Sequence, residues 1–143
     1  MTTHPYSSEV LQLAADIPRI GRLPAPHASA RKVSRLCGSS LDLDLCVEDG
    51  RISDLALELE ACALGQAAAS VLARDGVGAT PAEIRAAREA LKAMLKEGRS
   101  FPEGRFAALA ALAPAKDYPA RHGSVMLAFD AACAALDALE ANA

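Results

Sequence analysis

Two of the four cysteines lie where a thiol could do chemistry. Cys37 comes just before a predicted strand, and Cys62 lies where a second predicted strand passes into a helix. The dipole and the free N–H groups at the beginning of a helix favour a thiolate, which is both a metal ligand and a nucleophile. If the two strands pair about the turn at residues 48–50, both cysteines lie at the same end of a hairpin. The spacing leaves two interpretations open: a shared thiol site, or two unrelated loop cysteines.

The remaining candidate residues have weaker signals. Cys46 lies on the strand face opposite the leucines, and Cys133 follows Phe129 at core spacing on the last predicted helix, so we expect both to be packing residues. His122 opens that helix in "PARHGS" and is a candidate metal ligand, with a solvated surface histidine as the alternative. No CxxC pair is present, which excludes a stand-alone zinc ribbon.

Alternating residues predict the sheet that positions these thiols. Segment 40–47 alternates leucine or valine with aspartate and cysteine, and segment 52–59 resumes the alternation after an Asp-Gly turn. Residues 31–36 can add a first strand. Asp42 and Asp44 are interpreted as the solvent-facing side of the central strand rather than as a carboxylate pair with a chemical role.

Helical periodicity accounts for most of the rest of the chain. The clearest local signal is the sequence Thr80, Pro81 and Glu83, a capping box that begins a helix ended by Gly98. A later helix is expected to stop at Pro114. Helices are predicted over residues 6–17, 63–75, 81–97, 103–113 and 118–143.

These elements predict an α+β fold in which helices cover a small three-stranded antiparallel sheet. We expect a single domain over residues 1–143. Within it, residues 21–30 are predicted to be a loop, and residues 77–118 a long helical insertion between the second cysteine and the last helix.

The composition and the charge argue against a nucleic-acid-binding protein and against a membrane-spanning protein. The chain has 143 residues, of which 52% are hydrophobic and 23% charged, as in globular domains. The net charge of −3 lacks the basic footprint of a nucleic-acid-binding protein. No apolar run approaches the roughly 18 residues of a membrane span, and no secretory signal is visible. We therefore expect a cytoplasmic protein whose cysteines stay reduced.

The residues around the two thiols resemble a known family. "CGSSLDLDLCVEDGRISDLALELEACALGQAAASVLA" resembles the iron–sulfur cluster assembly scaffolds of the IscU, SufU and NifU N-terminal type, and "YPARHGSVMLAFDAACAAL" resembles the last helix of that family. The resemblance covers nearly the whole chain and implies the SufE/NifU-like scaffold fold. The long segment between Cys62 and Ser124 favours the SufU-like branch.

The resemblance also implies a ligand set. In the family, three cysteines and one aspartate hold a zinc ion or a nascent cluster. Cys37 and Cys62 stand at two of these positions, but Ser39 stands for the aspartate and Ser124 for the third cysteine. A neutral hydroxyl is a poor ligand for zinc or iron. A four-ligand site would need His122 or an exogenous ligand, and a protein without any metal is the alternative.

By resemblance, the protein is a scaffold or sulfur acceptor rather than a turnover enzyme. Cys37 or Cys62 would take persulfide sulfur from a cysteine desulfurase of the SufS or IscS type and serve Fe–S acceptor proteins. In a homodimer, two cysteines from each subunit would satisfy a [2Fe–2S] cluster. Two alternatives stay open: a divergent paralogue without metal that acts as a protein-binding module, and a thiol–disulfide redox protein that uses Cys37 and Cys62.

Overall fold

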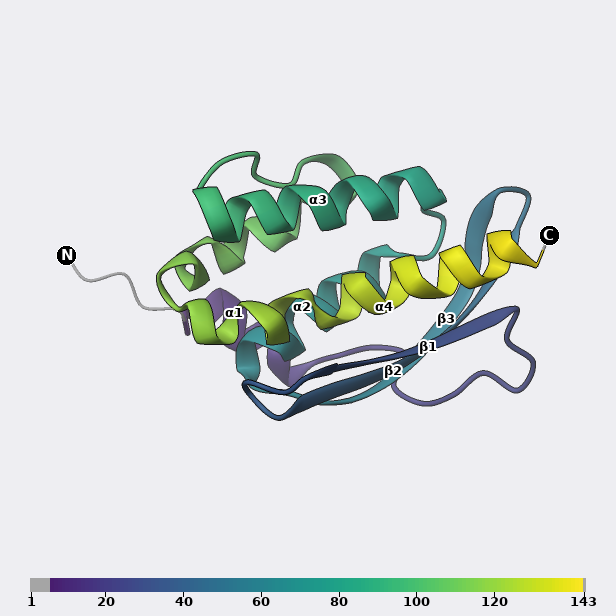
Figure 1. Ribbon diagram of the computed structural model, residues 1–143, viewed down its shortest axis with the longest axis horizontal. Helices are drawn as coiled ribbons and strands as arrows, with labels where there is room; N and C mark the ends of the chain where they lie inside the picture. The colour runs from purple at the N-terminus through teal and green to yellow at the C-terminus, as the bar shows by residue number, and fades with distance from the viewer. Residues whose placement is uncertain (1–5, 143) are drawn as a thin grey trace.

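The computed structural model describes residues 6–142 and shows helices covering one face of an antiparallel sheet (Figure 1). The sheet has three strands in the order β1-β2-β3. Helix α4 lies against β1 and β2, α2 packs beside α4, and α3 packs on α4 from the side away from the sheet. This arrangement confirms the predicted α+β fold. The elements are α1 (Ser8–Ala15), β1 (Ala28–Ser34), β2 (Ser39–Glu48), β3 (Arg51–Glu60), α2 (Ala63–Asp75), α3 (Pro81–Glu97), η1 (Gly104–Asp117), η2 (Pro119–Arg121) and α4 (His122–Ala141).

Strands β2 and β3 form the hairpin that the alternation predicts. Leu43 pairs with Leu57, and both side chains are buried beneath the helices. Asp49 and Gly50 make the turn with φ values of 54° and 74°, in the left-handed region that Asp-Gly turns tolerate. The hairpin therefore rests on a local turn signal and on one buried face.

Strand β1 begins at Ala28, so the last three residues of segment 21–30, which is predicted to be a loop, belong to the strand. The composition of this stretch is typical of a loop, yet Ala28 and Ala30 pack against the core, because α4 lies over the strand and small side chains suffice there. The strand ends at Ser34, so the last two residues of the predicted strand 31–36 lie in the following turn.

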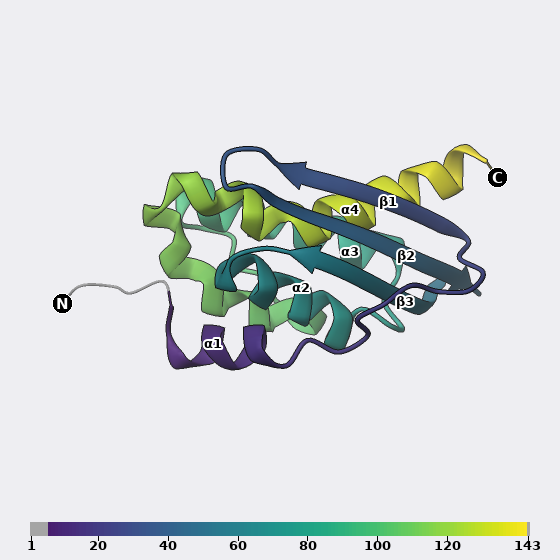
Figure 2. The ribbon, with the colours of Figure 1, turned by 90° about the horizontal axis from the view of Figure 1, so that it is seen from below.

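Asp44 does not face solvent, which corrects the sequence prediction. The segment that follows α1 crosses the outer face of the sheet (Figure 2), and the Asp44 side chain is 1% exposed. Arg22 donates two hydrogen bonds to its carboxylate at 2.9 and 2.8 Å, the backbone N–H of Leu23 donates one at 3.0 Å, and the Ser29 hydroxyl donates one at 2.6 Å. The hydrogen bonds from Arg22 hold the pKa of Asp44 well below its usual range. Asp42, on the same face, is 28% exposed.

The alanine-rich core allows close helix packing. Ala67 and Ala68 of α2 and Ala131 of α4 are completely buried, and such small side chains let the helix backbones approach one another. Phe106 and Phe129 meet edge to face with ring centroids 5.3 Å apart, which fills the space between η1 and α4. Within residues 6–142 no helix combines the length and the apolar character that a membrane crossing requires.

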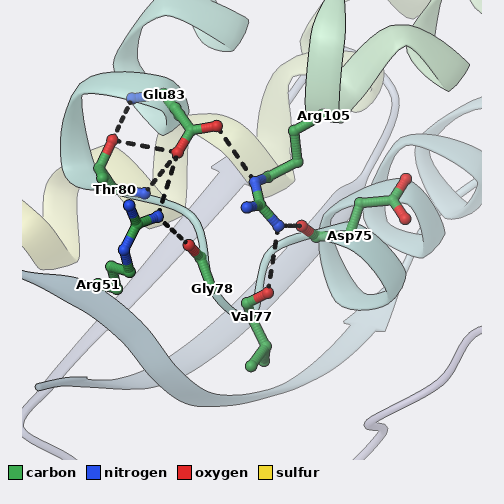
Figure 3. Close-up of polar contacts among 7 residues, drawn as sticks. All are labelled: Arg51, Asp75, Val77, Gly78, Thr80, Glu83 and Arg105. Atoms are coloured by element: carbon green, nitrogen blue, oxygen red, sulfur yellow. Dashed lines mark hydrogen bonds and ion pairs between the residues drawn. The ribbon is translucent and has the colours of Figure 1, made fainter.

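Helix α3 begins with the capping box that the sequence predicts. The Thr80 hydroxyl accepts a hydrogen bond from the backbone N–H of Glu83 at 3.1 Å, and the Glu83 carboxylate accepts one from the backbone N–H of Thr80 at 3.0 Å. Figure 3 shows two arginines around this box: Arg105 of η1 donates to Glu83 at 3.2 Å, and Arg51 of β3 donates to the carbonyl of Gly78 at 2.8 Å. Arg51 also forms an ion pair with Glu83 at 4.0 Å, so the box ties α3 to both η1 and β3.

The element η1 differs from the helix predicted over residues 103–113. It is a 3-10 helix that continues to Asp117, with a break in helical dihedral angles at Phe106 and with Pro114 inside it. Proline has no N–H to donate, and in a run of short turns its presence removes a single i→i+3 hydrogen bond. Pro114 therefore does not end the element. Together α3 and η1 make up most of the segment 77–118.

Candidate functional site

The β1–β2 turn and the beginnings of α2 and α4 meet at one end of the molecule (Figure 2). Ser40 pairs with Glu60 at the last step of the β2–β3 ladder, so Cys37 and Cys62 lie just beyond this end of the hairpin. Both side chains are partly exposed, and neither cysteine forms a disulfide within residues 6–142. The structure thus places the two candidate thiols at the same end of the hairpin.

The chain that enters α4 contacts both thiols. The Cys37 thiol donates to the backbone carbonyl of Ala120 at 3.2 Å, and the Cys62 thiol donates to the hydroxyl of Ser124 at 3.4 Å. Ala120 and Ser124 are four residues apart, about one helical turn. The two cysteines therefore lie against successive turns of the same segment.

Ser39 and Ser124 lie beneath the thiols. Their side-chain oxygens are 3.1 Å apart, and the two residues are 2% and 0% exposed. The resemblance singles out four positions. Cys37 lies in the β1–β2 turn, and Ser39 is the first residue of β2. Cys62 directly precedes α2, and Ser124 lies in the first turn of α4. We call these four residues the Cys–Ser site. Its four members lie at one end of the fold and are linked through Ala120 of η2 and Ser124 of α4.

Two glycines allow this close approach. A Cβ atom at Gly65 would collide with the hydroxyl oxygen of Ser124, and a Cβ atom at Gly123 would lie 2.5 Å from the hydroxyl oxygen of Ser34. The Ser34 oxygen is itself 3.2 Å from the sulfur of Cys37. Sequence reasoning missed Ser34, Gly65 and Gly123. The only local signal was a glycine in the first turn of each of the two helices.

The environment of Cys62 favours the thiolate. Burial by itself would raise the pKa of the Cys62 thiol. The hydrogen bond with Ser124 and the hydrogen bonds with the backbone of Gly65 and Leu64 outweigh burial, and the positive charge of Arg121 acts in the same direction. The net result is a pKa below the usual value for cysteine. The thiolate form of Cys62 is therefore more accessible than that of an ordinary cysteine.

His122 is the first residue of α4, as predicted, but its ring points toward η1. The residue is 5% exposed, and Nε2 lies 2.8 Å from the carbonyl oxygen of Ala115 and 3.2 Å from that of Lys116. Because a carbonyl oxygen only accepts, Nε2 carries a proton in this arrangement. Within residues 6–142, Nδ1 is buried without a hydrogen-bond partner. Metal ligation by His122 stays a prediction.

Cys133 packs in the core, as predicted, whereas Cys46 is partly exposed. Cys46 donates a long hydrogen bond of 3.6 Å to the carbonyl of Ala25. Cys133 is 8% exposed in the core, and burial raises the pKa of its thiol. Cys133 therefore differs from Cys62, which is partly exposed and has a lowered pKa.

Comparisons with known proteins identify the family. The chain is 30% identical over 124 residues to the iron–sulfur cluster assembly scaffold protein IscU of Thermotoga maritima, and the match covers 87% of each chain. The crystal structure of the N-terminal part of a nitrogen-fixing NifU-like protein from Brucella abortus is 46% identical, with a TM-score of 0.95 over 97% of this chain and 96% of that one. The chain belongs to the iron–sulfur cluster assembly scaffold family.

A more distant relative shares the fold. A proposed SUF-system scaffold protein, SufU of Fervidobacterium islandicum, has a TM-score of 0.84 at 22% identity, over 92% of this chain and 96% of that one. No protein-family model matches the chain. The predicted family and fold are therefore confirmed. The SufU-like branch stays a prediction, because a likeness at this identity shows the fold alone.

Proposed function

We propose that the protein accepts sulfur during iron–sulfur cluster assembly, with Cys62 as the thiol that receives it from a cysteine desulfurase. The observation that carries this proposal is the state of the Cys62 thiol: it is partly exposed, has a lowered pKa, and makes a hydrogen bond with Ser124. Membership in the scaffold family supports the choice of reaction. The cytoplasmic location and the delivery to Fe–S acceptor proteins belong to the same proposal.

The chemical step is an attack of one sulfur on another. The Cys62 thiolate attacks the outer sulfur of a cysteine persulfide on the donor, and a new S–S bond forms on Cys62. The S–S bond of the donor breaks, and its electron pair leaves with the donor cysteine as a thiolate. The proton of the outer sulfur travels with that sulfur. No oxidant or reductant is consumed, so the Cys62 thiolate and one donor persulfide suffice.

Cys37 is the second thiol of the proposal. Its sulfur lies at the same end of the hairpin and donates a hydrogen bond to the carbonyl of Ala120 rather than to Cys62. A [2Fe–2S] cluster is the cargo that two such thiols suit best, because two copies of the chain would together supply the four thiolates that the cluster requires. Within one copy the site offers Cys37 and Cys62 as its only sulfur donors, while Ser39 and Ser124 are neutral hydroxyls.

The test is persulfide transfer followed by mass spectrometry. The purified protein is incubated with a cysteine desulfurase and L-cysteine, and the thiols and persulfides are then alkylated. We expect Cys62 to gain the mass of one sulfur atom. The Cys62→Ser variant should gain none, whereas Cys46→Ser, a matched control for a cysteine outside the site, should load like the wild type.

Two other outcomes would support the alternatives. If neither Cys37→Ser nor Cys62→Ser alters desulfurase binding or turnover, the chain acts as a protein-binding module. If counting thiols with and without reductant shows a reversible Cys37–Cys62 disulfide and no persulfide, the pair acts in redox chemistry. Loading of Cys37 in place of Cys62 would contradict the assignment of the acceptor.

A further inference from the structure

The hydroxyl groups of Ser39 and Ser124 form a buried pair directly beside the Cys62 sulfur. The oxygens are 3.1 Å apart, and the Ser124 oxygen is 3.4 Å from the sulfur. At 2% and 0% exposure, neither residue is open to solvent, and within residues 6–142 the two hydroxyls hydrogen-bond with each other and with Cys62. The three polar groups therefore form a chain that ends at the sulfur.

This donor set does not fit a single metal ion. Two thiols and two neutral hydroxyls make a weak site for zinc or iron, and the hydroxyls are already bonded to each other. Across residues 6–142 no group of three or more His, Cys, Asp and Glu side chains is arranged to hold a metal ion. The Nε2 atom of His122 faces the carbonyl of Ala115. One copy of the chain thus lacks the four ligands that the family resemblance implies.

The same groups fit a sulfur anion well. When Cys62 is a thiol, its S–H donates to Ser124, and the hydroxyl proton of Ser124 is free to point toward Ser39. A hydroxyl has one proton, so when the sulfur becomes an anion, Ser124 can turn its proton toward the sulfur and accept the proton of Ser39 instead. Only hydroxyl protons rotate, and no heavy atom moves. Hydrogen bonds to a charged group are stronger than neutral ones, and chains of hydrogen bonds reinforce one another.

The packing of α2 on α4 fixes the position of Ser124. The Gly65 Cα leaves no room for a side chain next to the Ser124 hydroxyl, and a Cβ there would also lie 2.9 Å from the Ser124 carbonyl oxygen. Ser39 is held by the first step of β2, where it pairs with Ser34. Since both serines lie on ordered elements, the Ser124 oxygen is kept at a fixed place relative to Cys62.

We propose that the Ser39–Ser124 pair makes this a sulfur-transfer site in place of a single-ion metal site: Ser124 positions and hydrogen-bonds the Cys62 sulfur, and Ser39 acts through Ser124. This inference rests on the proposed sulfur-acceptor function and names the residues that adapt the site to it. Both serines are positioning residues, because only Cys62 touches the incoming sulfur.

The first experiment measures sulfur loading from a small-molecule donor, glutathione persulfide, without any desulfurase. We expect Ser124→Ala to load Cys62 about tenfold or more slowly, the effect of losing one hydrogen bond to a charged sulfur. Ser39→Ala should show a smaller loss. Ser70→Ala is the matched control, because Ser70 is also 2% exposed but donates to the carbonyl of Asp16, away from the site. Circular dichroism of each variant checks folding.

A second readout separates positioning from simple loss of packing. The rate of Cys62 alkylation by iodoacetamide is measured against pH. In Ser124→Ala the midpoint of this profile should move to higher pH, while Ser70→Ala should leave it in place. Equal loading rates and equal profiles for Ser124→Ala and the wild type would overturn the inference.

The third readout is metal content. After incubation with zinc and dialysis, the wild type should retain no stoichiometric zinc, whereas the double variant Ser39→Asp/Ser124→Cys should retain one ion per chain. Zinc retained by the wild type and lost in both Cys37→Ser and Cys62→Ser would refute the claim. If desulfurase transfer fails but loading from glutathione persulfide depends on Ser124, the proposed function is wrong and this inference stands. If desulfurase transfer succeeds but loading from glutathione persulfide does not depend on Ser124, this inference is wrong and the proposed function stands.

Discussion

Ser39 and Ser124 are 85 residues apart in the sequence, yet their hydroxyl oxygens are 3.1 Å apart in the folded chain. The contact exists because α4 returns over the sheet and places its first turn against the beginning of β2. The same turn brings Ser124 to Cys62. The Cys–Ser site is therefore assembled only when the last helix is docked, and any opening of α4 dismantles it.

Thiol reactivity should separate the cysteines. At pH 7, iodoacetamide should modify Cys62 faster than Cys133 by at least on the order of tenfold, because the pKa of Cys62 is lowered whereas burial raises the pKa of Cys133. Peptide mass spectrometry over a time course measures both rates. In denaturant the two rates should converge. Equal rates in the native protein would contradict the difference in environment.

Gly65 should be essential to the packing of α2 on α4. Gly65→Ala adds a methyl group that collides with the Ser124 hydroxyl, and we expect a loss of about 1–3 kcal/mol in the free energy of unfolding. In the double variant Gly65→Ala/Ser124→Ala the colliding oxygen is absent, so part of this loss should be recovered. Urea denaturation of the four proteins completes the cycle. Strict additivity would show that the collision is relieved elsewhere.

Asp44 should be a main determinant of stability. Asp44→Asn keeps the size but removes the charge that accepts hydrogen bonds from Arg22, Leu23 and Ser29, and should lower the free energy of unfolding by about 2–4 kcal/mol. Asp42→Asn is the control. Asp42 makes a solvent-exposed ion pair with the half-exposed Arg31, and its loss should cost about 1 kcal/mol or less.

The contribution of Asp44 should also make the stability of the protein depend on pH. The pKa of Asp44 is lowered in the folded protein, so its stabilising effect is complete above the unfolded-state pKa of about 3.9 and is lost as the pH falls further toward the folded-state value. The wild type should therefore lose stability more steeply below pH 4 than Asp44→Asn. Thermal melts between pH 2.5 and 7 measure this, and parallel curves would argue against it.

The stability of helix α3 should depend on its N-cap residue, Thr80. Thr80→Ala removes the hydroxyl that accepts from the Glu83 N–H, with an expected cost of about 1 kcal/mol. Thr80→Ser keeps the hydroxyl and should stay within a few tenths of a kcal/mol of the wild type. Thermal unfolding of both variants is the measurement. A Thr80→Ser variant as unstable as Thr80→Ala would mean that the methyl group, rather than the cap, matters.

Cluster assembly should require two copies of the chain. Anaerobic reconstitution with iron and sulfide should give visible absorbance and bound iron only in the fraction that elutes as a dimer, since one copy holds two thiols of the site. Cys37→Ser and Cys62→Ser should each abolish the absorbance, and Cys46→Ser should not. Iron bound by the monomeric fraction would contradict the shared site.

Local signals predicted much of the fold. The alternation in β2 and β3, the turn at Asp49 and Gly50, and the capping box at Thr80 each depend on neighbours within a few residues, so the sequence displays them directly. The prediction that Pro114 ends a helix was wrong. The effect of a proline depends on whether it lies in an α-helix or in a run of 3-10 turns, and packing decides which of the two forms.

Long-range contacts were beyond such signals. The alternation correctly placed Asp44 on the outer face of the sheet, but nothing near Asp44 shows that Arg22 crosses that face and buries the carboxylate. The meeting of Ser39 with Ser124 was implied by family resemblance alone. The spacing of Cys37 and Cys62 about the turn did place both thiols at one end of the hairpin, because strand pairing converts sequence distance into position.

Cys62 also occupies the N-cap position of α2, where it makes no side-chain capping hydrogen bond. Serine, aspartate and asparagine are far better residues there, and any of them would be expected to strengthen the helix. A screen for thermal resistance at position 62 would thus enrich the very variants that have lost the sulfur. A variant selected for stability at this position would therefore lack the thiol that we propose accepts sulfur.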